Sequence, residues 1–238
     1  MKKLKKNHEQ SFIDGFSNYL SRKAQESGRQ VTRCSLDGQD TVYGADYIFT
    51  NHTNFLMVEF KYDKSDVKLE GKKPRRLTLC RILDDEDGWR QLSSQCHYVA
   101  WSEFLEIDNV GGRRPRFNAY YDEVCNRAVF GEDSGLIKQS PYEESRLKAG
   151  LLVRDFLSGE LGTDFQSFEV YTNWLMSLED SGDTGIELIV DHPDEDELLL
   201  MEFTSVRELK TWLDLTAFEP PKPTPKPKPR GSSGPGMR

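Results

Sequence analysis

Three charged side chains interrupt two apolar stretches in the first third of the chain. Asp46 begins the first stretch, and Glu59 and Lys61 lie inside the second. A charge in a strand that is about to be buried is costly unless it is paired or binds an ion. Two carboxylates can hold a hard divalent cation such as Mg²⁺, and a nearby lysine can orient or deprotonate a water bound to that cation. These residue types therefore predict metal-assisted hydrolysis of a phosphodiester.

The backbone that must bring these side chains together is an antiparallel hairpin. Residues 46–50 and 55–62 are predicted strands, and the polar residues 51–54 form the turn between them. Glu59 and Lys61 are two residues apart, so they project from the same face of their strand. Because Asp46 enters the partner strand, the hairpin can place it beside them. We therefore expect two carboxylates and one ammonium to meet at one end of a sheet.

Asp46, followed by Glu59-Phe60-Lys61 at the end of an apolar run, resembles the motif of the PD-(D/E)xK nuclease superfamily. That superfamily has the restriction-endonuclease-like fold. The resemblance implies a metal-dependent deoxyribonuclease whose catalytic residues are Asp46, Glu59 and Lys61. The chain departs from the motif at Ala45, which stands where the family has proline.

The resemblance also implies residues outside the hairpin. Many members carry a glutamate on the first helix as a further metal ligand, and Glu9 matches it because it shares the apolar stripe of Phe12 and Phe16. The implied metal ligands are thus Glu9 together with the two motif carboxylates, and the implied cofactor is Mg²⁺, for which Mn²⁺ would substitute. Gln91 resembles the polar residues that some members place on the second helix near the phosphate.

Apolar periodicity predicts the elements that must position this motif. The predicted order is helix 8–26, strands 30–36, 46–50 and 55–62, a polar loop over 63–76, helices 75–83 and 89–96, and strand 97–101. The superfamily fold has the same order, with the motif on the strands that follow the first helix. We therefore expect an α/β fold, with a restriction-endonuclease-like mixed sheet flanked by helices.

The second half of the chain carries weaker signals. They predict a basic loop over 110–116, a helix over 142–157, a hairpin made of strands 186–190 and 198–203, and a helix over 206–215. We expect a nuclease-like core over residues 1–101, a C-terminal α+β extension of unknown role over 102–218, and a disordered Pro/Lys-rich tail over 219–238.

Two basic clusters are candidates for contacts with a DNA backbone. The first comprises Arg113, Arg114 and Arg116 in the predicted basic loop, and the second comprises Lys72, Lys73, Arg75 and Arg76 just after the motif. A basic cluster of this kind can equally be a solvated loop, so both interpretations stay open.

Cysteine and histidine usage gives no sign of a zinc site. The cysteines at positions 34, 80, 96 and 125 are far apart and show no paired CxxC spacing, so we expect reduced thiols rather than disulfides. His97 lies in an apolar strand, which favours a hydrogen-bonded core histidine. The first residues are basic but lack the apolar segment of a secretory signal, and no apolar run is long enough to span a membrane. These features predict a cytoplasmic protein without a membrane partner.

The charge balance is unfavourable for a protein that binds DNA unaided. The net charge is −8, and residues 221–238 contain five basic residues and no acid, so the rest of the chain holds 27 basic and 40 acidic residues. DNA binders normally present a basic face to phosphates. One interpretation is a nuclease whose grip on DNA comes from a protein partner or a second copy, in a bacterial defence, restriction or repair system. The alternative is a catalytically inactive nuclease-like adaptor that binds a protein partner through its acidic surface.

Overall fold

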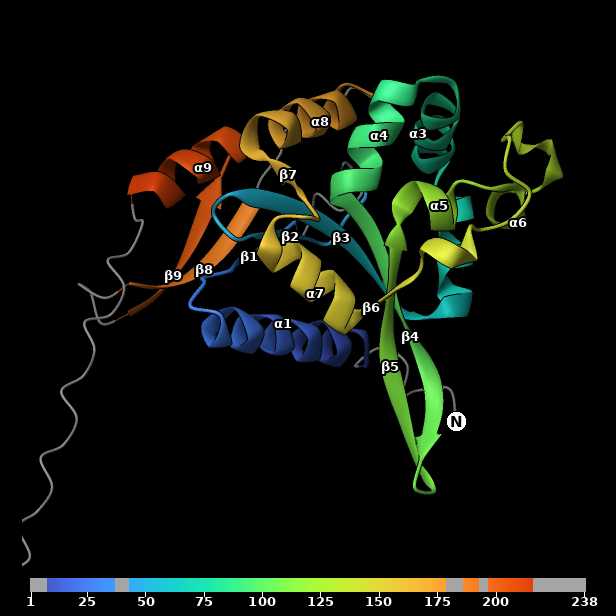
Figure 1. The fold of residues 1–238 in the computed structure, drawn as a ribbon. Coiled ribbons are helices and arrows are strands. Elements are labelled where there is room, and N and C mark those ends of the chain that lie inside the picture. Colours follow the sequence, from blue (N-terminus) through green and yellow to red (C-terminus); the bar gives the residue numbers. More distant parts are fainter. Residues whose placement is uncertain (1–7, 37–42, 179–185, 193–196, 216–238) are drawn as a thin grey trace, which may run out of the picture.

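The computed structural model describes residues 8–36, 43–178, 186–192 and 197–215, and their nine strands form one mixed sheet (Figure 1). The strands are β1 (Thr32–Ser35), β2 (Tyr47–Thr50), β3 (Asn54–Asp63), β4 (His97–Ile107), β5 (Val110–Ala119), β6 (Leu147–Lys148), β7 (Thr163–Asp164), β8 (Ile186–His192) and β9 (Glu197–Phe203). Their spatial order is β6-β5-β4-β3-β2-β1-β8-β9, and β7 pairs with the first residues of β3. Residues on both sides of position 101 therefore contribute to the same sheet.

Helices cover both faces of this sheet (Figure 1). They are α1 (His8–Glu26), α3 (Pro74–Asp85), α4 (Asp87–Cys96), α5 (Tyr120–Val124), α6 (Arg127–Phe130), α7 (Ala149–Ser158), α8 (Phe165–Ser177) and α9 (Val206–Leu215), with the 3₁₀ segments η2 (Lys64–Lys72), η3 (Glu132–Ser134) and η4 (Glu143–Ser145). One core joins α1 and α7 to the sheet, and the other joins α3, α4, α8 and α9 to its opposite face. None of the described helices is long and apolar enough to cross a membrane.

Strand β3 is central because its sequence, NFLMVEFKYD, is almost continuously apolar, as in strands buried on both faces. It pairs antiparallel with β2 and parallel with β4, and all the other pairings in the sheet are antiparallel. Alternate β3 residues point to opposite cores: Leu56, Val58 and Phe60 face α1, and Phe55 and Met57 face α8 and α4. Glu59 lies on the same face of β3 as Phe55 and Met57, so it points toward the core that contains α3, α4, α8 and α9.

Several predicted elements are confirmed. The first helix has the predicted bounds, and Gly28, with φ +67°, follows its last turn in the left-handed region that favours glycine. Both predicted hairpins are present as β2–β3 and β8–β9, and the closing helix is α9. The predicted disordered tail lies outside the described residues. The division of the chain into a core and an extension stays a prediction.

The predicted basic loop over 110–116 is wrong, because these residues belong to strand β5. Strands β4 and β5 form a long ribbon that extends well beyond the body of the protein (Figure 1). A two-residue turn at Asp108 and Asn109 closes it, with φ +52° and +62°. Aspartate and asparagine tolerate this conformation, and the tight turn keeps the ribbon in register. The glycines that indicated a loop instead lie within a strand.

Other boundaries differ from the prediction as well. The predicted helix over 142–157 begins only at Ala149, since the preceding residues form η4 and the short strand β6. Residues 64–72, predicted as loop, form η2, which Asp63 caps by accepting a hydrogen bond from the Ser65 N–H at 3.1 Å. Helix α8 was not predicted. These elements are held by tertiary contacts more than by a periodic sequence.

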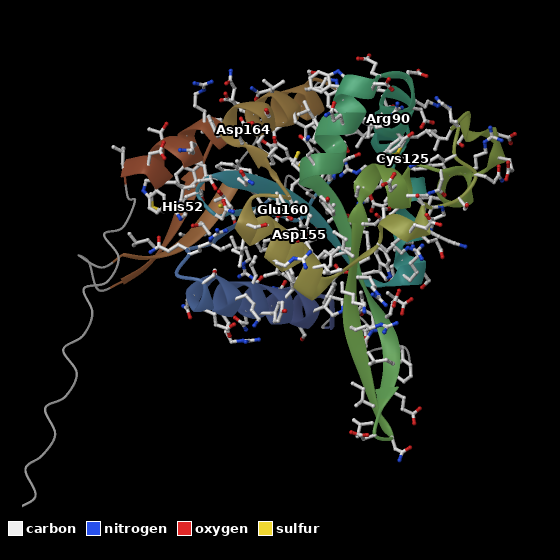
Figure 2. All side chains as sticks on the ribbon, viewed as in Figure 1. His52, Arg90, Cys125, Asp155, Glu160 and Asp164 are labelled. Atoms are coloured by element: carbon white, nitrogen blue, oxygen red, sulfur yellow. A yellow bond between two sulfur atoms is a disulfide. The ribbon has the colours of Figure 1, made fainter. Side chains whose placement is uncertain are left out.

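The prediction of reduced thiols is wrong for two of the four cysteines. Cys80 on α3 and Cys125 at the end of α5 form a disulfide, and Cys125 is labelled in Figure 2. Their Cα atoms are 5.0 Å apart although 45 residues separate them in the chain. A search for local CxxC spacing cannot detect a pair that only the tertiary fold brings together. Cys34 and Cys96 are buried free thiols.

Removing this bond should lower stability, because it closes a loop of 45 residues in the unfolded chain. We expect Cys80→Ala/Cys125→Ala to reduce the free energy of unfolding by about 3–4 kcal/mol, measured by urea denaturation without reductant. Reductant should shift wild type toward the double variant and leave the variant unchanged. Cys34→Ala, which removes a buried free thiol, is the control for loss of packing. Coincident unfolding curves for oxidised wild type and the double variant would contradict the bond.

Candidate active site

The three residues of the predicted motif, Asp46, Glu59 and Lys61, meet at one end of the sheet. Asp46 lies just before β2, where its N–H donates to the Val58 carbonyl at 3.0 Å, so it stands beside Glu59 across the hairpin. Its Oδ2 accepts a hydrogen bond from the Phe60 N–H at 2.6 Å. The prediction that the hairpin juxtaposes Asp46 with Glu59 and Lys61 is thus confirmed as geometry.

Glu9 reaches the same end of the sheet from the first turn of α1. Its Oε2 accepts a hydrogen bond from the Tyr62 N–H at 3.0 Å, one residue past Lys61. Burial raises the pKa of the Glu9 carboxyl, and the nearby Lys61 ammonium only partly offsets this. Glu9, which lies on the apolar stripe predicted for this helix, therefore points toward Glu59 and Lys61.

Lys61 is held between two buried carboxylates. Its ammonium contacts Glu59 Oε1 directly and lies 3.1 Å from Glu70 Oε1. Lys73 contacts the same two oxygens, at 3.2 Å and 2.9 Å. Burial alone would lower the pKa of Lys61, but the two carboxylates outweigh it and raise that pKa above its usual range. Lys61 is thus a cation held in one position.

Glu70 is the residue that sequence reasoning missed. It lies in η2 with no exposed surface, and its Oε2 accepts a hydrogen bond from the Tyr120 hydroxyl at 2.8 Å and lies 3.4 Å from Arg76 Nε. Burial would raise its pKa, but the surrounding cations Lys61, Lys73 and Arg76 lower it to about 2. Glu70 is therefore ionised and anchors the lysines. The only feature of the sequence that could have indicated this role is that Glu70 is an acid among several lysines.

Arg76 and His97 fix the backbone that leads into Asp46. Arg76 packs so closely on Gly44 that a Cβ there would lie 2.7 Å from the arginine Nη1, and Gly44 has φ +75°. The ring of His97 lies 2.8 Å from the Gly44 carbonyl and 3.0 Å from the Tyr171 hydroxyl. Burial lowers the His97 pKa to about 3, so the neutral ring donates to the carbonyl and accepts from the tyrosine. The expectation of a core histidine is confirmed.

The electrostatics of the cluster favour one bound proton. Burial and the neighbouring Glu59 carboxylate raise the Asp46 pKa to about 8, although Lys61 acts in the opposite direction. The cluster contains four acids and three cations. The acids are Glu9, Asp46, Glu59 and Glu70, and the cations are Lys61, Lys73 and Arg76. A protonated Asp46 makes the two charges equal. With Asp46 ionised, the cluster has one negative charge in excess.

The site offers a metal two carboxylates rather than three. Among the described residues, no three His, Cys, Asp or Glu side chains are grouped so that they could hold a metal ion. One observation nevertheless fits a cation: Glu59 Oε2 is buried and accepts no hydrogen bond, while both lysines contact the other oxygen. Mg²⁺ is commonly held by one or two carboxylates, with water and phosphate oxygens as its other ligands. Asp46 and Glu59 fit that pattern.

The candidate DNA-binding residues are dispersed. Arg113 pairs with Asp63, and Arg114 and Arg116 both pair with Glu103, so each arginine of the ribbon has an acidic partner. Of the second cluster, Lys73 belongs to the active-site cluster, whereas Lys72 is exposed at the end of η2. Gln91 is exposed on α4. Their roles in binding DNA stay predictions.

Comparisons with protein-family models, with curated proteins and with solved structures found no match to this chain. The chemistry of the site is therefore the basis for proposing a function. Its strongest elements are the two adjacent carboxylates, the orphaned Glu59 oxygen and the fixed position of Lys61.

The raised pKa of Asp46 predicts a pH-dependent effect of Asp46→Asn in EDTA. The unfolded carboxyl ionises near pH 4, whereas the folded one keeps its proton up to about pH 8. Wild-type stability should fall across that window by up to about 1.4 kcal/mol per pH unit from this group, and the variant lacks this loss. The stability of Asp46→Asn relative to wild type should therefore rise from pH 5 to 8 in denaturant titrations. A constant difference would contradict the shift.

The close approach of Arg76 predicts a matched pair of glycine variants. Gly28→Ala meets nothing within 4 Å and should cost only the left-handed backbone, about 1–2 kcal/mol. Gly44→Ala has the same backbone cost and also displaces a buried guanidinium, which should add about 1–3 kcal/mol. Thermal or urea unfolding of both variants measures the difference. Equal losses would show that Arg76 does not hold the turn before Asp46.

Proposed function

We propose that this chain is a metal-dependent nuclease of the restriction-endonuclease-like type, which hydrolyses phosphodiester bonds in DNA. The observation that carries the proposal is the meeting of Asp46, Glu59 and Lys61 at the end of one sheet, with Glu9 beside them. A structural ion pair needs no second carboxylate with a raised pKa next to it. The cluster has one more acid than it has cations, so its charges balance only when Asp46 is protonated, and a bound cation would take the place of that proton.

The charge of the cluster supports a phosphodiester as the substrate. With its acids ionised, the cluster has four negative and three positive charges. A divalent cation held by Asp46 and Glu59 would change that excess to one positive charge. One phosphodiester group carries one negative charge, so the loaded site and the substrate would be electrically matched.

Each residue then has a role that its position allows. A bound Mg²⁺ would lower the pKa of a coordinated water and offset charge on the phosphate. Glu70 and Glu59 keep Lys61 charged and fixed, which suits a lysine that orients the attacking water and stabilises developing negative charge. Lys73 provides a second cation at the same oxygens and would face the phosphate from the η2 side.

The acidic body leads us to propose that a protein partner or a second copy supplies part of the grip on DNA. Outside residues 221–238 the chain has 27 basic and 40 acidic residues, and the arginines of the ribbon are paired with acids. Such a cutting subunit would suit defence, restriction or repair. A second candidate is an inactive nuclease-like adaptor, which the lack of a three-acid metal group among the described residues favours.

The proposal predicts metal-dependent cleavage of DNA. We expect supercoiled plasmid or single-stranded DNA to be cut with Mg²⁺ or Mn²⁺ and not with EDTA. Lys61→Ala should lower the rate at least about 100-fold, because it removes the group that positions the water. Lys68→Ala removes an exposed lysine of η2 outside the site and is the control. Thermal unfolding in EDTA checks that both variants fold.

Calorimetry with Mg²⁺ and Mn²⁺ separates the two candidates if wild type cuts nothing. Metal binding that Asp46→Asn abolishes would identify an intact site whose substrate grip comes from a partner. The absence of both cleavage and metal binding would overturn the nuclease proposal and favour the adaptor. Cleavage that survives in Lys61→Ala would show that this lysine has no part in the chemistry.

A further inference from the structure

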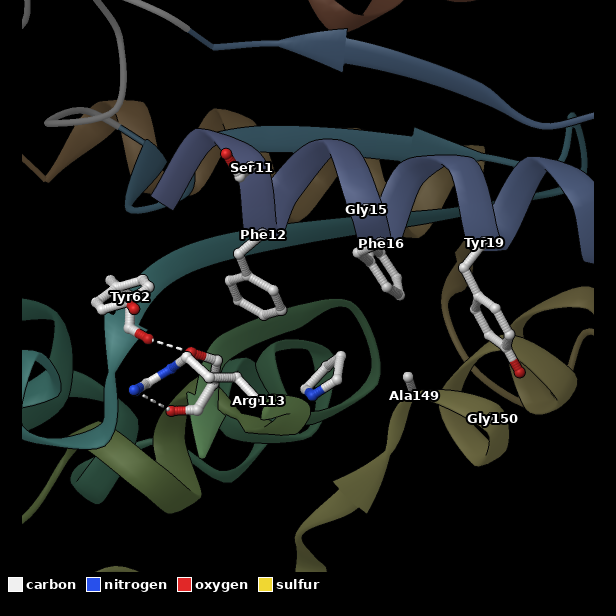
Figure 3. Close-up of a pocket in the computed structure, with 11 residues that line it drawn as sticks. Ser11, Phe12, Gly15, Phe16, Tyr19, Tyr62, Arg113, Ala149 and Gly150 are labelled. Carbon is white, nitrogen blue, oxygen red and sulfur yellow. Dashed lines mark hydrogen bonds between the residues drawn. The ribbon is translucent and has the colours of Figure 1, made fainter. Parts of the chain in front are cut away.

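A pocket of about 520 Å³ adjoins the candidate active site (Figure 3). It lies between α1, the base of the β4–β5 ribbon and the first turn of α7, and pockets of this size take drug-sized ligands. Helix α1 lines one wall with aromatic side chains, as Figure 3 shows. The lining residues are Ser11, Phe12, Gly15, Phe16, Tyr19, Tyr62, Ser102, Arg113, Pro115, Ala149 and Gly150.

The pocket and the active site share a wall. Tyr62 lines the pocket, and its N–H donates to the Glu9 carboxylate. Phe12 lies one helical turn after Glu9 on the same face of α1. A chain whose phosphate lies at the carboxylates could therefore place a neighbouring group in the pocket.

The planar guanidinium of Arg113 is held in one position at this shared wall. Its guanidinium lies over the Tyr62 ring, 4.4 Å from the centroid, and donates to the Ser102 hydroxyl at 2.6 Å, to the Ser102 carbonyl at 3.1 Å and to Asp63. The Ser102 hydroxyl in turn donates to the Tyr62 carbonyl (Figure 3). Arginine planes and aromatic rings are the surfaces on which nucleobases stack.

Gly15 keeps the pocket deep. It lies in the interior of α1, where glycine costs about 1 kcal/mol relative to alanine, and its backbone is helical, so no special conformation requires it. A Cβ at this position would meet nothing within 4 Å, so no neighbour requires it either. Glycine at this position leaves open space on the pocket wall. Glycine often occurs where a ligand must approach the backbone closely.

We propose that this pocket binds one unpaired nucleobase of the strand that the active site cuts. The inference rests on the proposed nuclease function and adds a substrate class: single-stranded, flapped or frayed DNA, because a base held in a duplex cannot enter. The aromatic wall of α1 and the Tyr62–Arg113 pair supply stacking surfaces. Ser102 also lines the pocket, but its hydroxyl is already bonded to the Tyr62 carbonyl and to Arg113, so the pocket offers a base stacking surfaces rather than hydroxyl partners.

Binding of a fluorescent base tests the pocket without relying on cleavage. A single-stranded oligonucleotide with one 2-aminopurine loses fluorescence when that base stacks, and EDTA prevents any cutting. Gly15→Leu places a side chain in the pocket and should weaken binding about tenfold or more. Tyr62→Leu removes one stacking surface but keeps the backbone donor to Glu9, and should weaken binding similarly. Asn18→Leu places the same leucine side chain at an exposed position of α1 outside the pocket and should bind like wild type.

Each outcome decides the inference. Quenching by wild type and Asn18→Leu that is lost in Gly15→Leu and Tyr62→Leu supports it. The absence of quenching in wild type, or equal quenching in all four folded proteins, overturns it. Tighter binding of 2-aminopurine deoxyribonucleoside monophosphate than of the strand assigns the pocket to a free nucleotide and overturns the strand assignment.

Cleavage assays distinguish this inference from the proposed nuclease function. If the nuclease function holds and the inference fails, Gly15→Leu cuts single-stranded DNA as fast as wild type. If the nuclease function fails, no variant cuts DNA with any metal, and the fluorescence assay still reports whether the pocket takes a base.

Discussion

Burial of negative charge at the end of the sheet is the constraint on which the rest of the site depends. Glu59 and Glu70 have almost no exposed surface, and an unpaired buried carboxylate is strongly unfavourable. The cations that neutralise them are Lys61 on β3, Lys73 between η2 and α3, and Arg76 on α3. The sequence of residues 64–76 shows little periodicity. The path of this segment is therefore set by the need to place Lys73 and Arg76 beside the buried carboxylates.

The parts of the fold that depend on local pattern could be predicted from the sequence. The stripe of α1, the apolar runs and polar turns of the two hairpins and the spacing of Glu59 and Lys61 all lie within a few residues of one another in the chain, so each could be read locally. These patterns were sufficient to predict that Glu9 and Asp46 lie beside Glu59 and Lys61. Contacts between distant residues could not be predicted this way: Tyr120 reaches Glu70 across 50 positions, and Cys80 meets Cys125 across 45. Their residue types carry no sign of their partners.

The ribbon shows how composition can mislead about both structure and charge. Glycine, proline and three arginines suggested an exposed basic loop, but the pleated pairing of β4 and β5 sets Glu103 directly opposite Arg114, and its carboxylate also holds Arg116. The result is a projecting arm with paired charges and exposed apolar residues near its end, Phe104, Ile107 and Val110. The arginines of the ribbon, which a count of the sequence treats as available positive charge, are thus already paired with acidic side chains.

The order of strands in the sheet also governs when the protein can fold during its synthesis. The face of β2 and β3 that α1 packs against is completed by α7, which begins only at Ala149, and β1 gains its second neighbour only from β8. A nascent chain that has released only its first hundred residues would expose the large apolar surface around Phe16, Phe49 and Phe60. Such intermediates aggregate readily. The segment that carries Asp46, Glu59 and Lys61 is thus made early by the ribosome, yet the core and the sheet around it are complete only when most of the chain has been translated.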